Sequence, residues 1–290
     1  MTEQNQNPLS AYFRAPKTYT GIPSGGKFYG PEVLTIPESG EFAIYPMTTK
    51  DELQLKNPDA LLNGEAVANL IKSCVPEIKD PKSMFSADVD ALLIAIRGAS
   101  GGDLVEVQAE CPLCNTTTSV NVSVEESLAK MQTLEDEYTI DISNGLKITA
   151  MPFSYANTIK AGVASFQSTR SMQSISELTD DMERLSAFND SFVRLADLNF
   201  ELLVDSIRSV TYMNAEGENQ TIVDKAIIRE FLENTENTTG KEIEDFINDV
   251  NGKGVKNEVQ VMCTNEECNN ATEGFNAPIN FDPVNFFTGT

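Results

Sequence analysis

Two close pairs of cysteines, set far apart in the sequence, constrain the fold of this chain most strongly. The pairs are Cys111 with Cys114 and Cys263 with Cys268. Apolar and polar residues alternate before each pair, which predicts a β-strand running into it, and a second segment of strand character follows each pair. The four expected strands cover residues 104–110, 116–124, 258–262 and 274–281. The order of strand, cysteine pair and strand therefore occurs twice.

This repeated order is typical of a zinc ribbon, in which two turns between strands each supply two thiolates to one metal ion. Cys111 and Cys114 have the standard spacing, and the spacing of Cys263 and Cys268 lies at the long end of the usual range. We therefore expect these four cysteines to hold one structural zinc, because four thiolates leave no open coordination position. Two alternatives stay open: unconnected cysteines at strand ends, or a redox-active Cys-X-X-Cys beside unrelated thiols. The fifth cysteine, Cys74, falls in a helix pattern and is expected to be a buried small apolar residue.

A shared zinc site requires the long segment between the two pairs to leave the ribbon and return to it. The entropy of closing a loop grows only with the logarithm of its length, so a folded insertion is energetically tolerable. We predict an α+β protein in which a small mixed domain with a split four-cysteine zinc ribbon carries a large, mostly helical insertion. The predicted parts are an extended N-terminal arm at 1–21, the α+β zinc-ribbon domain at 22–124 plus 258–283, the insertion at 125–257 and a C-terminal tail at 284–290.

Within these parts, the spacing of apolar residues predicts several helices and two hairpins. A core helix is expected at 86–97, where apolar residues recur at the spacing of one helix face. Asn144-Gly145 between two apolar segments favours a tight β-hairpin. Further helices are expected at 156–169, 176–208, 224–232 and 241–250, and the strands of the two hairpins at 33–36 with 41–47 and at 138–142 with 146–151.

The composition excludes several classes of function. The chain has no histidine, which rules out Ser-His-Asp and Cys-His nucleophile arrangements and histidine metal ligands. Its 44 acidic and 21 basic residues give a net charge of -23, which opposes binding to phosphate backbones and to anionic lipid headgroups. No segment approaches the ~20 apolar residues of a membrane span, and the first residues lack the pattern of a signal peptide. We therefore expect a soluble cytoplasmic protein without a nucleic-acid or membrane partner.

One segment matches a nucleotide-binding motif by spacing alone. Residues 21–27 satisfy the GxxxxGK pattern of a phosphate-binding loop, but Phe28 stands where a magnesium-binding hydroxyl is needed. No apolar strand precedes the segment, and Pro31 and Val33 follow where a helix should begin. We therefore predict no nucleotide, no small-molecule substrate and no catalytic residue.

The two ends of the chain carry aromatic residues outside any clear periodic pattern. Tyr12, Phe13 and Tyr19 lie in the N-terminal arm, and Phe286 and Phe287 lie beyond the last expected strand. Exposed aromatic side chains are enriched at protein interfaces. We hypothesise that at least one end is an arm that docks on a neighbouring protein; the alternative is that the C-terminal pair folds back on the core.

Five short motifs occur in a fixed order between residues 22 and 124. They are Pro-Ser-Gly-Gly-Lys-Phe-Tyr at 23–29, a strand ending in Ile-Tyr-Pro-Met at 44–47, the helix start Thr-Thr-Lys-Asp-Glu at 48–52, Asp-Val-Asp-Ala-Leu-Leu-Ile-Ala-Ile-Arg at 88–97 and the strand into Cys-Pro-Leu-Cys at 111–114. This order resembles the baseplate hub subunit family of T-even-like contractile-tailed bacteriophages. The resemblance implies a non-enzymatic protein that helps to build the central hub of the tail baseplate and contacts other phage tail and baseplate proteins.

The same resemblance implies a location in the host cytoplasm during assembly. It leaves open whether the protein stays in the tail baseplate of the virion or acts only in assembly, and whether it forms an oligomer. An alternative from another class is an intracellular zinc-ribbon adaptor of the transcription or replication type, which would grip a protein partner through its helical region. A basic stripe would favour such an adaptor on nucleic acid, and the sequence has none.

Overall fold

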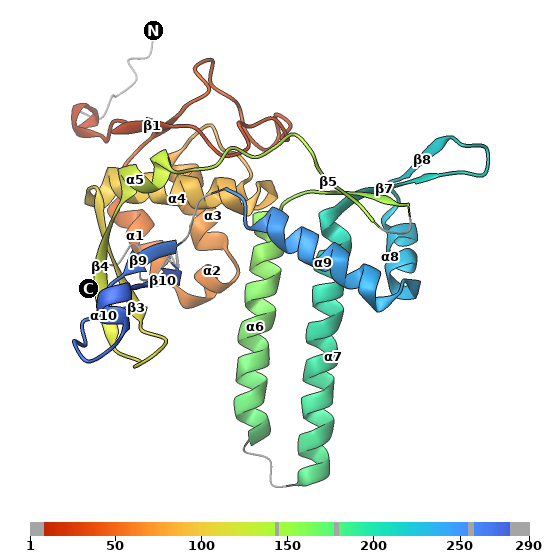
Figure 1. Ribbon diagram of the computed structural model, residues 1–290. Helices are drawn as coiled ribbons and strands as arrows, with labels where there is room; N and C mark the ends of the chain where they lie inside the picture. Colours follow the sequence, from red (N-terminus) through yellow and green to blue (C-terminus); the bar gives the residue numbers. More distant parts are fainter. Residues whose placement is uncertain (1–8, 143–144, 177–179, 255–257, 279–290) are drawn as a thin grey trace.

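The computed structural model describes residues 9–142, 145–176, 180–254 and 258–278. The protein is α+β, as predicted, and its strands form small antiparallel sheets in the described residues. One body holds the helices of the first hundred residues together with the cysteine segments (Figure 1). A second body holds a four-stranded sheet and two helices, and two long helices project side by side away from both (Figure 1).

The helices and strands have the following bounds. Up to residue 129 they are η1 (Ser10–Tyr12), β1 (Thr18–Thr20), β2 (Phe42–Ile44), α1 (Thr49–Leu55), α2 (Pro58–Leu62), α3 (Glu65–Cys74), η2 (Pro81–Ser83), α4 (Ser86–Gly101), β3 (Leu104–Glu110), β4 (Thr117–Ser123) and α5 (Val124–Ala129). After it they are β5 (Tyr138–Asp141), β6 (Lys147–Ala150), α6 (Tyr155–Ser176), α7 (Asp181–Ser206), β7 (Ile207–Met213), β8 (Asn219–Ile222), α8 (Lys225–Asn234), α9 (Asn237–Asn251), β9 (Glu258–Val261), α10 (Asn270–Glu273) and β10 (Phe275–Pro278).

Helix α4 is the centre of the first hydrophobic core, which confirms the predicted core helix. Every residue from Ala91 to Ile96 is buried, so the helix is covered on all sides rather than along one stripe. Leu92 and Ile96 belong to a cluster with residues of β2 and α3, while Ala91 and Ile94 contact the start of α5 and strand β3. The helix therefore joins the N-terminal residues to the first cysteine hairpin.

A carboxylate is buried inside this core. Asp88 of α4 is fully buried, and its two oxygens accept hydrogen bonds from the Ser24 N–H group, at 2.8 Å, and from the Tyr29 hydroxyl. The Tyr29 oxygen accepts in turn from the Phe85 N–H group at 2.8 Å. Burial raises the pKa of Asp88 above its usual range. The glycine-rich segment that matches a phosphate-loop pattern thus fastens to α4, with Gly25 in the left-handed region at φ 61°.

The hairpin predicted for residues 33–47 is wrong. Strand β2 pairs instead with β1, in the register Tyr19 with Ala43, where no regular element was expected. Leu34, in the other predicted strand, forms an isolated bridge with Ile78. Leu34 and Phe42 are both buried in the same core, so the apolar pattern was right, but alternation in such short segments does not specify which strand pairs with which.

An arginine fixes the segment that leads into β1. Arg14 donates to the carbonyl oxygens of Pro46 and Ser73, both at 2.6 Å, and lies 3.5 Å from the buried carboxylate of Asp51. The side chain also donates to the Ser73 hydroxyl at 2.8 Å. Residues 14–20 are therefore held against the body, and this part of the predicted arm contacts the chain's own core.

Substitution Arg14→Ala is expected to lower the free energy of unfolding by about 2 kcal/mol, because it removes the donor to two part-buried carbonyls and the cation beside the Asp51 carboxylate. Chymotrypsin should also cut at Tyr19 faster, since the segment is released. The control Lys17→Ala changes a charge in the same segment at an exposed side chain. Equal urea midpoints for Arg14→Ala and the parent chain would contradict the anchoring role.

The second body is a sheet of order β5-β6-β7-β8, with all neighbours antiparallel, packed against α8 and α9. Its core includes Ile148 and Ile207 from the sheet and Ile243 and Ile247 from α9. The hairpin predicted at 138–151 is confirmed, although Asn144 lies outside the described residues. Strands β7 and β8 were not predicted. The helix expected at 176–208 is confirmed as α7, but it begins at residue 181 and ends at residue 206, so the expected helix overlaps the first two residues of β7.

Two contact sets join the second body and α6 to the first. The Tyr155 N–H group donates to the Met84 carbonyl at 2.7 Å, and the Ser86 N–H group donates to the Phe153 carbonyl at 2.9 Å. Residues 124–134 pack on the first body, where Leu134 is buried. The division into a ribbon domain and an insertion at 125–257 stays a prediction.

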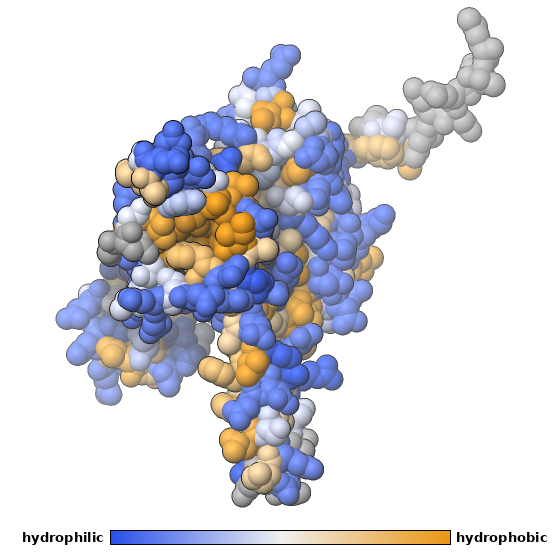
Figure 2. All heavy atoms as spheres, turned by 90° about the vertical axis from the view of Figure 1, so that its right-hand side faces the viewer, coloured by the Kyte–Doolittle hydropathy of each residue, from blue (hydrophilic) through white to orange (hydrophobic). Residues whose placement is uncertain are grey.

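Helices α6 and α7 form a projecting hairpin (Figure 1). Seen from the side that carries β8 and α8, apolar side chains gather in a hollow on the body above, and others lie along the projecting hairpin among hydrophilic ones (Figure 2). Within the part of the chain that the structure describes, none of the helices combines the length and apolar character needed to span a membrane.

Candidate metal centre

The first cysteine pair lies in the turn of the β3–β4 hairpin. The strands pair from Leu104 with Ser123 to Glu110 with Thr117. The Cys111 N–H group donates to the Thr116 carbonyl at 3.0 Å, and the Asn115 N–H group donates to the Cys111 carbonyl at 2.9 Å. Asn115 adopts φ 56°, a left-handed conformation that asparagine tolerates better than most residues. This tight turn points both thiols of the pair to one side.

The second pair lies between β9 and β10, which pair antiparallel. The Cys263 N–H group donates to the Asn270 carbonyl at 3.0 Å, and the Cys268 N–H group donates to the Asn265 carbonyl at 3.0 Å. Helix α10 then returns the chain to β10. The four residues between these two cysteines thus form a loop with both ends fixed by backbone hydrogen bonds.

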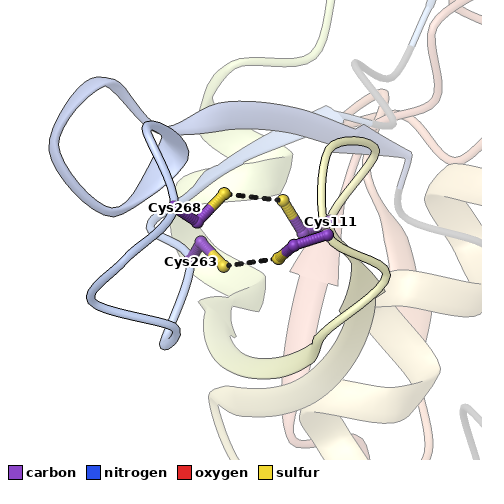
Figure 3. Close-up of side chains that lie close together, drawn as sticks. Cys111, Cys263 and Cys268 are labelled. Atoms are coloured by element: carbon purple, nitrogen blue, oxygen red, sulfur yellow. Dashed lines mark hydrogen bonds between the residues drawn. The ribbon is translucent and has the colours of Figure 1, made fainter.

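The two hairpins face each other, as predicted from the repeated pattern. Ala109 of β3 contacts Val261 of β9 and Ala277 of β10 in a small apolar cluster. The Thr264 N–H group donates to the Thr118 hydroxyl at 3.3 Å, which ties the second turn to β4. Segments separated by the whole middle of the chain are thereby held side by side (Figure 3).

All four predicted ligands meet in one cluster. The Sγ atoms of Cys111 and Cys268 are 3.8 Å apart, those of Cys114 and Cys263 are 3.5 Å apart, and all four sulfurs lie within 4.8 Å of one another (Figure 3). These separations are far longer than a disulfide bond of about 2.0 Å. Four sulfurs arranged tetrahedrally at about 2.3 Å from a metal would be about 3.8 Å apart. The donor set therefore fits a four-coordinate thiophilic ion.

Polar groups favour the thiolate form of the first cysteine pair, whereas burial and the neighbouring thiols raise the pKa of Cys263 and Cys268. The Asn270 side-chain amide donates to the Cys111 sulfur at 3.3 Å, and Asn270 itself is buried. The Thr116 hydroxyl lies 3.3 Å from the Cys114 sulfur. This hydroxyl and the Thr116 backbone N–H group lower the pKa of Cys114 to about 6. A thiolate is the form that binds a metal, so Cys114 is ready to act as a ligand near neutral pH.

Cys74 does not join the cluster. It is fully buried at the end of α3, as the sequence predicted, and burial raises the pKa of its thiol to about 11, with the Asp51 carboxylate acting in the same direction. A thiol in this state is a weak nucleophile. Its role is to fill the core beside Arg14.

The model of the T4 bacteriophage base plate protein family matches residues 18–277. The chain belongs to that family. The match includes both cysteine pairs and the projecting hairpin, and so extends well beyond the motifs at 22–124 that suggested a baseplate protein. Neither a search of curated proteins nor a search of solved structures found a match.

Sequence reasoning found the four cysteines of this base plate family member but missed the residues that support them. Asn270 donates to Cys111 from outside both cysteine motifs, and Thr118 and Thr264 join the hairpins from strand and turn positions. No spacing rule marks such residues, because their side chains reach the site only after the hairpins have met. The sole signal is that Asn270 follows Cys268 by two residues in the same turn.

Proposed function

We propose that this protein is a non-enzymatic subunit or assembly factor of the hub of a phage tail baseplate, and that it binds other tail proteins. Membership of the base plate family carries the proposal, because it supports a structural role in the tail. The ordered motifs between residues 22 and 124 support the hub in particular. Family membership also favours this proposal over an adaptor of transcription or replication.

We infer that Cys111, Cys114, Cys263 and Cys268 hold one structural zinc ion. The support is the approach of four sulfurs to within 4.8 Å and the match of their separations to a tetrahedral site. When bound, zinc would supply a cross-link between the two hairpins. The residues of the chain contribute the thiolates, the Asn270 amide and the turns that aim all four sulfurs at one point.

Substitution Asn270→Ala is expected to weaken zinc binding about tenfold, because groups that hydrogen-bond to metal ligands orient them and stabilise their charge. Competition with a chromogenic chelator would measure the change in affinity. Asn269→Ala is the matched control, since Asn269 is exposed and its side chain makes no cap hydrogen bond. Equal zinc affinities for the two variants would contradict a supporting role of Asn270.

The hub proposal is tested by following the protein through infection. A tagged chain should co-purify with tail proteins from infected host cytoplasm, where we place its action during assembly. Mass spectrometry of finished particles then separates the two forms of the proposal: a hub subunit is present in the particle, and an assembly factor is absent. Failure to co-purify with any tail protein, together with absence from particles, would contradict both.

A further inference from the structure

The projecting hairpin contains an open groove. Helices α6 and α7 run antiparallel, and a groove of about 1080 Å³ lies between them. Small residues line much of it, among them Ala164 and Ser171 on α6 and Ala187 and Ser191 on α7. The two helices do not close over these small side chains, so the pair lacks the interlocking apolar layer of a closed bundle. The hairpin therefore resembles two helices of a bundle in which no further helix covers the groove between them.

Apolar side chains line part of the groove. Val163, Leu195 and Leu198 line it, and each of these residues is only half-buried. Further apolar side chains are exposed elsewhere on α7, including Phe192 with 63% of its surface accessible. Figure 2 shows such residues along the hairpin, among hydrophilic ones. Exposed apolar surface of this kind marks an interaction site.

The charges in the groove differ from those of the rest of the protein. The chain carries a net charge of -23, yet the groove is lined by three cations and one carboxylate, Asp190. Lys160 pairs with Asp205 at 3.8 Å. Arg170 and Arg194 are exposed and form no ion pair with any other residue that the structure describes. Two guanidinium groups are thus available for carboxylates from outside the chain.

We propose that the groove between α6 and α7 binds an amphipathic helix of a partner protein, with the apolar face of that helix in the groove and acidic side chains against Arg170 and Arg194. A helix of about three heptads would match the projecting part of the hairpin. The arginines select an acidic partner, since a basic helix would place like charges beside them.

Two designed peptides of about 21 residues test this proposal, with leucine at the core positions of each heptad and either glutamate or lysine at the flanking positions. Fluorescence anisotropy with the full-length protein at about 0.15 M salt measures their affinities. The glutamate peptide should bind about tenfold more tightly than the lysine peptide, although the protein is strongly acidic. The double variant Arg170→Glu/Arg194→Glu should reverse this order, while Arg208→Glu, at an exposed site on β7, should keep it.

A second variant fills the groove without changing charge. Ala187→Phe should reduce binding of the glutamate peptide about tenfold, whereas Ala196→Phe, at an exposed position of α7 outside the groove lining, should leave it unchanged. Equal affinity for both peptides, or full binding to Ala187→Phe, would overturn the proposal. So would sedimentation data showing that the parent chain is a dimer and that Ala187→Phe makes it a monomer, because the occupant would then be a second copy.

Discussion

Substitution Cys111→Ser is expected to abolish zinc binding and to lower the free energy of unfolding by about 4 kcal/mol or more, because the free energy of metal binding at a structural site contributes directly to folding. The Cys111 sulfur lies 3.8 Å from that of Cys268 and accepts from Asn270, so its replacement by a hydroxyl removes one of the four ligands. Elemental analysis should find about one zinc per parent chain and none in the variant. Urea denaturation measures the loss of stability.

Two further variants, a control cysteine outside the cluster and a ligand from the second pair, test whether the zinc site is shared by both pairs. Cys74→Ala should keep the full zinc content, since Cys74 lies in the α3 core and outside the sulfur cluster. Cys263→Ser should behave like the Cys111 variant, because its sulfur lies 3.5 Å from that of Cys114. A folded parent protein that contains no zinc, or a Cys263 variant that retains it, would disprove the shared site.

Substitution Asp88→Ala is expected to lower the free energy of unfolding by about 3 kcal/mol. Asp88 is the acceptor for the Ser24 N–H group and the Tyr29 hydroxyl inside the first core, and the variant leaves both donors buried without a partner. Asp197→Ala, an exposed change on α7, should alter stability by less than about 0.5 kcal/mol. A similarly small effect of Asp88→Ala in urea denaturation would show that water or another group replaces the carboxylate.

The buried carboxylate also predicts a pH dependence. Burial raises the pKa of Asp88 in the folded protein above the unfolded value of about 3.9, so the folded state binds this proton more readily than the unfolded state does. The associated stability is fully present below the unfolded pKa and is lost as the pH rises through the folded pKa. Relative to Asp88→Asn, the parent chain should therefore gain stability as the pH falls. A gain with rising pH would mean that the donors of Ser24 and Tyr29 outweigh burial.

The cysteine cluster could be predicted from the sequence because each cysteine pair has a local pattern and the two pairs together supply the four ligands of a tetrahedral site. Each pair carries its own strand on either side, and two half-sites of two thiolates leave only one simple way to reach four ligands. The approach of the two pairs could therefore be predicted although they lie far apart in the sequence. Helix α4 was predictable for a similar reason, since its run of apolar residues needs a covering layer on every side.

Other elements depend on tertiary contacts that no local sequence pattern indicates. Strand β7 begins at Ile207 directly after α7 ends at Ser206, without glycine or proline between them, so apolar spacing continued the helix into the strand. What ends the helix is the sheet, where Val210 pairs with Ile148. The open groove was equally hidden, because the sequence predicts two helices but does not specify how far apart they lie.

The separation of the two cysteine hairpins also sets an order of events during synthesis. Cys111 and Cys268 are 157 residues apart in the chain, so the β3–β4 hairpin leaves the ribosome long before its counterpart exists. Domains fold as they emerge, and both hydrophobic cores precede residue 258. Closure of the sulfur cluster then follows the formation of both cores, because it needs a chain translated past Cys268. A chain that stops before residue 258 would contain both cores but lack the second cysteine hairpin. It could be recognised by Cys111 and Cys114, whose thiols would have no second cysteine pair beside them.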